Sequence, residues 1–312
     1  MKTRTILVAS ALASLLACSK ASSPQSKSQT FATPDEAIKA LAAAVKDPGS
    51  EKLIAIFGPD GQSLINTADA GADRRARQVF KVAVAERWHL EDQGPDTKVL
   101  VIGNEDWPFP IPLVKEGSGW RFDVAKGRDE ILNRQVGRNE IAAIEAVRTY
   151  VFAQRVYAKH PHDGKPAGLY ARTFQSDPGR QNGLYWVTSH KERPSPLGDL
   201  VAQAAAEGRS LGAGAKPTPF HGYYYKILTG QGSAASGGAK DYVVNGELSG
   251  GFALVAWPAQ HGVTGITTFL INQDGVPREK DLGDGTDAAA RAMTQYNADE
   301  SWAVVEQTAV TK

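Results

Sequence analysis

The sequence predicts an α+β protein of two domains, and three observations support that prediction. Apolar residues recur at helical spacing over residues 34–87 and then alternate at strand spacing over residues 88–124. The same order returns later, with a helical pattern at 139–159 and strand patterns between 223 and 280. The 312 residues, 42% of them hydrophobic, exceed the usual size of a single domain. We therefore expect helices and an antiparallel sheet in each half.

The first helix is expected to begin just after Thr33. The tetrapeptide Thr-Pro-Asp-Glu at residues 33–36 supplies an N-cap, a proline at the first helical position and a capping-box glutamate. Apolar residues then follow on one face, at Ile38, Leu41 and Val45. Two further helices are expected over residues 50–57 and 72–87.

A meander of short strands is expected next, over residues 88–92, 98–102, 109–114 and 120–124. Prolines at 108, 110 and 112 place the third strand at a sheet edge, because proline donates no hydrogen bond to a neighbouring strand. Helices followed by a curved meander resemble the cystatin or nuclear-transport-factor-2 type. Residues 31–126 are therefore expected to form an N-terminal α+β domain.

The second half repeats the order of helix followed by strands, but its helix is longer. Residues 127–137 are expected to be a connector with a short helix, and a long amphipathic helix should cover about 139–159. His160-Pro161 ends it, and an irregular region rich in Gly and Pro covers residues 161–219. Strands are then expected at residues 223–229, 241–244, 252–257, 267–272 and 276–280.

The first 17 residues are expected to be a lipoprotein signal peptide. Lys2 and Arg4 precede an apolar run at residues 6–16, which is too short to span a membrane. The string Leu-Leu-Ala-Cys at 15–18 resembles the bacterial lipobox. This resemblance implies that the thiol of Cys18 receives a diacylglycerol group and that its amine, freed by cleavage, is acylated. The alternative is an ordinary signal peptide whose cleavage site contains a cysteine.

The lipobox resemblance also implies a location. Acyl chains such as palmitate would hold Cys18 in a membrane, because each buried methylene contributes about 0.8 kcal/mol. Ser19 and Lys20 occupy the positions where an aspartate would resemble the inner-membrane retention signal. This implies the outer membrane, with the protein facing the periplasm. Residues 18–30, rich in Ser, Gln and Lys, are expected to be a disordered tether.

Composition excludes several classes of function. The chain has 35 basic and 34 acidic residues, and a net charge of +1 creates no field that would attract nucleic acid. Acylation of Cys18 would remove the only thiol, which excludes disulfides, cysteine catalysis and thiolate metal sites. We predict no cofactor and no nucleic-acid partner.

A metal site is one hypothesis for the region that follows the long helix. His160, His162 and Asp163 bring two imidazoles and a carboxylate together, a donor set that suits Zn or Cu. The alternative is that they are solvated side chains of a polar loop. A metal would need a further ligand, for which the candidates are His190, His221 and His261.

Gly-Arg-Ser-Leu-Gly at residues 208–212 matches the Gly-x-Ser-x-Gly nucleophile elbow, which needs its serine on a turn from a strand into a helix. Here the context is reversed, because an alanine-rich helical pattern precedes Ser210 and a loop follows it. These glycines are better explained as a helix cap and a linker. We therefore assign no catalytic residue, and the expectation leans against an enzyme.

Aromatic residues form the third candidate site. Tyr223, Tyr224 and Tyr225 are consecutive on an expected strand, so Tyr224 must point away from its two neighbours. Together with Trp257 and His221, Tyr224 could line a groove for sugar rings or a peptide. The alternative is that these aromatic residues belong to the core.

Four strings resemble a bacterial family catalogued as domain of unknown function 2950. They are Asp-Trp-Pro-Phe-Pro-Ile-Pro-Leu at 106–113, Gly-Leu-Tyr-Trp at 183–186, His-Gly-Tyr-Tyr-Tyr at 221–225 and Gly-Phe-Ala-Leu-Val-Ala-Trp-Pro at 251–258. The resemblance covers nearly all of the chain after the leader. It implies an exported protein without an assigned reaction.

The second half also resembles the globular part of type IV pilins and type II secretion pseudopilins, over about residues 138–283. The resemblance rests on a long helix, a Gly-rich segment, and the string Gly-Tyr-Tyr-Tyr-Lys-Ile-Leu-Thr-Gly at 222–230. It implies a pilin-like domain at 138–285, followed by a helix and tail at 286–312. Assembly into filaments is not implied, because pilins polymerise through an N-terminal hydrophobic helix that continues into the globular helix.

Taken together, the sequence predicts a lipid-anchored protein of the cell envelope that acts as a non-catalytic binding or assembly module. Its expected partners are the membrane, through the lipid, and an envelope protein or glycan. Two alternatives remain open at this point. One is a periplasm-facing hydrolase whose site is assembled only by folding, and the other is a metal-binding envelope protein.

Overall fold

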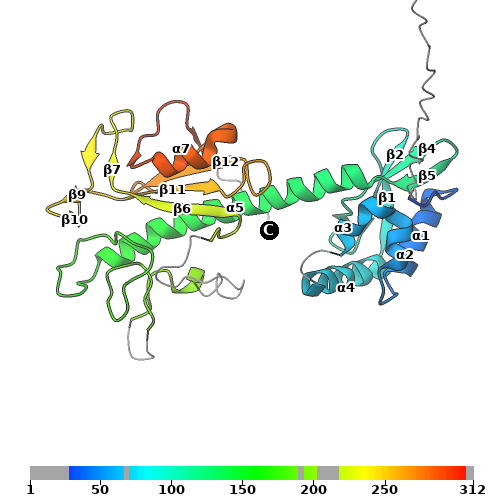
Figure 1. Ribbon diagram of the computed structural model, residues 1–312, viewed down its shortest axis with the longest axis horizontal. Helices are drawn as coiled ribbons and strands as arrows, with labels where there is room; N and C mark the ends of the chain where they lie inside the picture. Colours follow the sequence, from blue (N-terminus) through cyan, green and yellow to red (C-terminus); the bar gives the residue numbers. More distant parts are fainter. Residues whose placement is uncertain (1–27, 67–69, 189–192, 202–217, 307–312) are drawn as a thin grey trace, which may run out of the picture. The chain divides into compact units, whose positions relative to one another are not determined.

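The computed structural model describes residues 28–66, 70–188, 193–201 and 218–306 (Figure 1). Cys18, His190 and Ser210 lie outside these residues. The chain divides into two compact units, Met1–Glu130 (unit 1) and Ile131–Lys312 (unit 2). Both contain helices and antiparallel strands, so the predicted α+β class is confirmed.

Unit 1 begins with a series of helices, α1 Pro34–Ala44, α2 Glu51–Phe57, η1 Pro59–Gly61, α3 Gln62–Ile65 and α4 Ala70–Glu86. The expected start of the first helix is confirmed. The Thr33 hydroxyl accepts a hydrogen bond from the Glu36 amide at 3.2 Å, and the Glu36 carboxylate accepts one from the Ala32 amide at 3.2 Å. These two bonds satisfy amides that the first helical turn would otherwise leave unpaired.

The sheet of unit 1 contains β1 Trp88–Asp92, β2 Thr97–Ile102, β3 Trp107–Pro108, β4 Leu113–Glu116 and β5 Gly119–Phe122. The strands pair antiparallel in the order β1-β2-β4-β5, and β3 also pairs with β2. The single strand predicted at 109–114 is wrong, because β4 begins only at Leu113. Prolines at 110 and 112 donate no backbone hydrogen bond, which shortens the strand.

Helix α5, Val124–Ala158, runs through the segment expected to be a connector with a short helix. Glycines at 127 and 137 led to that expectation, yet each costs a helix interior only about 1 kcal/mol. Gly127 also has a packing role, because a Cβ there would lie 2.6 Å from Cγ1 of Ile111. A glycine that allows close packing therefore does not mark a break in this helix.

Unit 2 is built on a five-stranded antiparallel sheet in the order β15-β13-β12-β11-β6. Its strands are β6 Tyr223–Leu228, β11 Ala253–Pro258, β12 Thr267–Asn272, β13 Arg278–Asp281 and β15 Ala303–Val304. Helix α7, Thr286–Ala292, packs over β11, and the C-terminal half of α5 passes along the sheet (Figure 1). The Tyr150 hydroxyl of α5 donates to the Ala253 carbonyl at 3.2 Å, within a core that contains buried Val147, Leu254 and Phe269.

Smaller strand pairs complete unit 2. A three-stranded sheet has the order β14-β7-β8, formed by Gln295–Tyr296, Gly230–Gln231 and Lys240–Asp241. Strands β9 Val243–Val244 and β10 Glu247–Leu248 form a hairpin. The segment expected to be a helix and tail forms α7 and also contributes β14 to the three-stranded sheet and β15 to the five-stranded sheet. Strands of two residues are too short to produce a periodic sequence pattern.

No helix in the described part of the chain is both long and apolar enough to cross a membrane.

Candidate functional site

A polar cavity of about 420 Å³ lies in unit 2, beyond the C-terminal end of α5. It lies between the loop that follows α5 and the β9–β10 hairpin. Its lining contains three carboxylates, a lysine, an arginine and two tyrosines. The lining residues are Tyr157, His162, Asp163, Lys165, Pro166, Leu169, Tyr170, Arg172, Thr173, Asp177, Asn182 and Glu247.

Two of the lining residues, Tyr157 and His162, form an aromatic stack. The rings of Tyr157 and His162 lie 3.9 Å apart and nearly parallel, at 12°, and the Trp186 ring lies 5.6 Å from His162. The Tyr157 hydroxyl donates to the Gln181 carbonyl at 2.8 Å. Burial, followed by the negative charges of Asp163 and Glu247, raises the pKa of Tyr157 to about 12. Tyr157 is therefore a neutral hydrogen-bond donor at physiological pH.

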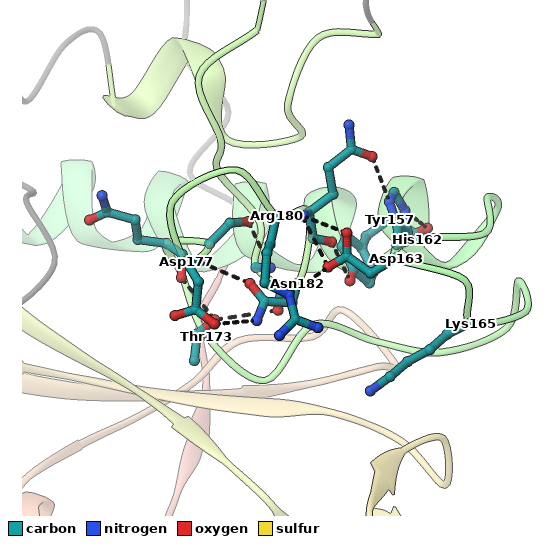
Figure 2. A network of polar contacts seen from close by, with 12 residues as sticks. Tyr157, His162, Asp163, Lys165, Thr173, Asp177, Arg180 and Asn182 are labelled. Atoms are coloured by element: carbon teal, nitrogen blue, oxygen red, sulfur yellow. Dashed lines mark hydrogen bonds and ion pairs between the residues drawn. The ribbon is translucent and has the colours of Figure 1, made fainter.

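Asp177 begins a tight turn that forms another wall (Figure 2). The Arg180 amide donates to the Asp177 carbonyl at 3.0 Å, and Pro178 and Gly179 at the two central positions, with φ +74° at the glycine, are typical of a type II turn. Asn182 binds Asp177 twice: its side-chain amide donates to Oδ2 at 2.7 Å, and its Oδ1 accepts from the Asp177 amide at 3.0 Å. These bonds fix the orientation of the Asp177 carboxylate.

The other end of this loop is held by Asp163. Its two carboxylate oxygens each lie 3.1 Å from the Gln181 amide, and Nε of Arg180 lies 3.4 Å from Oδ2. Gly183 ends the loop at a point where there is no room for a side chain, because a Cβ would lie 2.5 Å from the Gln175 carbonyl carbon. The loop over residues 177–183 is thus positioned before any ligand arrives.

The β9–β10 hairpin forms the opposite wall. It turns at Asn245 and Gly246, with φ of +50° and +80°, the backbone that an Asn-Gly hairpin turn requires. Nζ of Lys165 lies 2.6 Å from Glu247 Oε1, and Nη1 of Arg172 donates to the Gly246 carbonyl at 3.0 Å. The Leu248 carbonyl of the hairpin accepts from the Tyr170 amide at 2.8 Å. These contacts hold the hairpin against the loop.

The structure uses the predicted metal-site residues differently. Nε2 of His162 lies 2.9 Å from the Tyr157 carbonyl and Nδ1 lies 3.4 Å from Oε1 of Gln181, so both ring nitrogens face protein oxygens. The Asp163 carboxylate binds the loop, and burial lowers the pKa of His160. Among the described residues, no three His, Cys, Asp or Glu side chains are grouped so that they could hold a metal ion.

The predicted aromatic surface is partly occupied by the protein itself. Trp257 is buried, its ring lies 5.7 Å from that of Tyr224, and the Arg291 guanidinium of α7 lies 5.2 Å and 5.7 Å from the Tyr224 and Trp257 ring centres. Asp287 accepts from Nε1 of Trp257 and Nε of Arg291, both at 2.9 Å. The His221 ring instead lies 4.0 Å from that of Phe220, tilted by 50°. Arg291 therefore covers ring faces that a ligand would need.

Another histidine predicted as a candidate ligand, His261, lies between two carboxylates. Its Nε2 is 2.8 Å from Asp281, and its Nδ1 is 3.7 Å from Asp284. The Gly283 amide, followed by His261, lowers the pKa of Asp281. His261 does not line the cavity described above. One ring nitrogen of His261 is thus hydrogen-bonded to a carboxylate, and a second carboxylate lies near the other.

Most cavity residues were missed by sequence reasoning, which treated residues 161–219 as an irregular region. Lys165, Arg172, Asp177 and Asn182 belong to that region, and Glu247 follows much later. The Asp-Pro-Gly-Arg string at 177–180 and the Asn-Gly pair at 245–246 are turn signals that could have identified both walls. Neither signal shows that the two walls meet.

The sequence model of one family, described as Protein of unknown function (DUF2950), matches residues 28–305. No curated protein and no solved structure matches the chain. The matched range includes every residue of the cavity lining.

Proposed function

The chain belongs to the DUF2950 family, whose function is unknown, and on this premise we propose that the protein is a lipid-anchored binding module of the bacterial cell envelope. Unit 2 would bind a small hydrophilic ligand of the envelope, with a glycan as the class expected from the sequence. The proposal has two parts, an anchor at Cys18 and a binding site in the cavity, and each can be tested separately.

The observation that carries the binding role is the construction of the cavity. Its volume of about 420 Å³ lies within the range of small-molecule sites. Donors such as Arg172 and Lys165 and acceptors such as Asp177 line the same space, and a polyhydroxylated ligand both donates and accepts hydrogen bonds. The walls are fixed by their own hydrogen bonds, so little ordering would accompany binding.

The binding role is tested by calorimetry with the purified full-length Cys18→Ser chain and soluble fragments of cell-wall glycan and its peptides. We expect saturable binding that Gly183→Ala abolishes, because a side chain at residue 183 would displace the loop that carries Asp177. Absence of binding by any fragment at millimolar concentration would refute the binding role.

The anchor is supported by the leader and by the resemblance of residues 15–18 to a lipobox. Two or three acyl chains would hold the protein on a membrane far more firmly than one. Mass spectrometry of the mature N-terminus should find an acylated Cys18, and Cys18→Ser should move the protein from the membrane fraction to the soluble fraction. An unmodified N-terminus at any other residue would contradict the anchor.

We also propose that unit 2 shares the pilin fold without forming filaments, and that unit 1 is of the cystatin or nuclear-transport-factor-2 type. The support for the first likeness is a long helix, α5, that passes along an antiparallel sheet. The support for the second is the succession of helices and a meander. Experimental structures of both units would test the two likenesses, and electron microscopy of the lipidated protein should show no filaments.

A hydrolase remains the less supported alternative. Its sequence-based candidates were a serine elbow at Ser210 and histidines brought together by folding. The described part of the structure places Nε2 of His261 2.8 Å from Asp281, and its Nδ1 lies 3.7 Å from Asp284. A general base must lie within hydrogen-bond reach of the proton that it removes, and His261 does not line the cavity. The cavity, by contrast, is already large enough to hold a small ligand.

A further inference from the structure

Two side chains of opposite charge line the cavity without an ionic partner in the part of the chain that the structure describes. Arg172 and Asp177 both contribute to the lining, yet neither lies within ion-pair distance of an opposite charge among the described residues. Other charged groups of the same lining are paired: Lys165 with Glu247 at 2.6 Å, and Asp163 with Arg180 at 3.4 Å. The contrast distinguishes two ion pairs, which hold the walls, from two charged side chains that are available to a ligand.

Arg172 is positioned but only partly used. One of its nitrogens, Nη1, donates to the Gly246 carbonyl at 3.0 Å, which anchors the guanidinium on the hairpin. A guanidinium carries five N–H donors in a planar fork that fits a carboxylate with two parallel bonds. A carbonyl does not neutralise its charge. An anionic group entering the cavity would therefore meet a cation that is oriented by one hydrogen bond and not neutralised by it.

Asp177 carries the opposite charge and is also held in place by neutral groups. Its Oδ2 accepts from the Asn182 side-chain amide at 2.7 Å, and its backbone amide is occupied by Asn182 Oδ1 at 3.0 Å. Asn182 is neutral, so the carboxylate is oriented but keeps its full negative charge. A positively charged donor such as an ammonium group forms a hydrogen bond with such a carboxylate that is about twice as strong as one from a neutral donor.

From these two groups we infer that the ligand is zwitterionic, with a carboxylate that binds Arg172 and an ammonium group that binds Asp177. The inference rests on the proposed binding role and names the chemistry of its ligand. Two sources of envelope material carry this chemistry: a short peptide with free ends, and an acidic amino sugar with an unsubstituted amine. A neutral oligosaccharide has neither charge and would leave both residues unpaired.

Probes that differ by one charge test this inference. Triglycine carries both charges, N-acetyl-triglycine lacks the ammonium, and triglycine amide lacks the carboxylate. Muramic acid and N-acetylmuramic acid form the equivalent pair for an amino sugar. In calorimetry with the full-length Cys18→Ser chain, at least one zwitterionic probe should bind, and each blocked form of it should bind about 10- to 100-fold more weakly. Which of the two zwitterionic probes binds more tightly identifies the source.

Two substitutions assign each charge to its residue. Arg172→Gln should remove the preference for triglycine over its amide, and Asp177→Asn should remove the preference for triglycine over its acetylated form. If muramic acid is the probe that binds, Asp177→Asn should remove the preference for it over its acetylated form. Each variant should keep the preference that depends on the other residue. This crossed pattern would not result from general damage to the fold.

Matched controls exist elsewhere in unit 2. Arg155 also donates to a single carbonyl, that of Gln273 at 2.8 Å, and Asp274 also exchanges two hydrogen bonds with an asparagine, Asn272, both at 3.1 Å. Neither lines the cavity. Arg155→Gln and Asp274→Asn should leave both preferences unchanged.

The outcomes separate the inference from the proposed function. If envelope fragments bind but blocked and zwitterionic probes bind equally, or only neutral sugars bind, the inference is overturned and the binding role stands. If neither the probes nor the envelope fragments bind the folded chain, both are overturned.

Discussion

Two clusters in unit 2 combine aromatic rings with charged groups, and they differ in what already occupies them. In the α7 cluster, formed by Tyr224, Trp257, Asp287 and Arg291, the guanidinium lies over both rings and the carboxylate binds the guanidinium and the indole. In the cavity, Arg172 and Asp177 are held in place but have no ionic partner among the described residues.

The comparison shows that residue type alone does not identify a binding site. Aromatic rings and an arginine are typical of recognition surfaces, and the sequence analysis accordingly selected Tyr224 and Trp257. In the folded chain these groups satisfy one another, which makes them part of the packing between α7 and β11. The groups that remain unsatisfied lie in loops where no periodic pattern drew attention. Four substitutions test or refine this distinction, and they follow in order of decreasing effect on stability.

Trp257→Ala should have the largest effect. Trp257 is 3% exposed, so its truncation leaves a large cavity beneath α7 and should lower the free energy of unfolding by about 3–5 kcal/mol. Urea denaturation monitored by circular dichroism measures the change. As a control, Trp107→Ala removes an indole that is 46% exposed and should cost less than about 1 kcal/mol. A loss of ligand binding by folded Trp257→Ala, with little change in stability, would contradict the structural role of this cluster.

Gly183→Ala should affect both stability and the cavity. The added methyl group would lie 2.5 Å from the backbone of Gln175, so the loop must move, at a cost of about 1–3 kcal/mol. Thermal unfolding measures the cost. The control Gly137→Ala has open space around its Cβ within helix α5 and should stabilise the protein by up to about 1 kcal/mol. Equal behaviour of the two variants would show that the loop is not tightly positioned.

Arg291→Ala should uncover the aromatic rings of the α7 cluster. Loss of the cation–π contacts with Tyr224 and Trp257, together with the bond to Asp287, should lower the stability by less than Gly183→Ala does, because Arg291 is exposed to solvent. Acrylamide should then quench tryptophan fluorescence more strongly, because the Trp257 ring gains exposure. Unchanged quenching would mean that Arg291 does not cover the ring in solution.

Tyr157→Phe should have the smallest effect at neutral pH and a distinct effect in alkali. Loss of the bond to the Gln181 carbonyl should cost about 1 kcal/mol at pH 8. The pKa of Tyr157 is raised from 10.0 to about 12, so its contribution is fully present below pH 10 and is lost as the pH rises from about 10 to about 12. The difference in stability between wild type and variant, measured by urea unfolding, should therefore decrease between pH 9 and pH 11.5. A difference that stays constant over this range would contradict the raised pKa.

Much of unit 1 and the sheet of unit 2 could be predicted because their signals are local. The capping tetrapeptide at residues 33–36 determined where α1 begins, and alternation over residues 252–257 and 267–272 indicated the central strands. The sequence signals failed where the local preference of a residue conflicts with its packing in the tertiary structure. Glycines at 127 and 137 favoured a break, but packing against Ile111 explains the first of them within a continuous helix.

The sequence by itself determined the α+β class, the order of the longer helices and strands, and the family to which the chain belongs. Only the tertiary structure decided which charged groups are paired and which are not. Arg172 and Gly246 are 74 residues apart and meet because a hairpin folds back against a loop. Capping and periodicity depend on residues that are close in the sequence. The pairing of charges depends on distances between residues that are far apart in the sequence, and only the tertiary structure determines those distances.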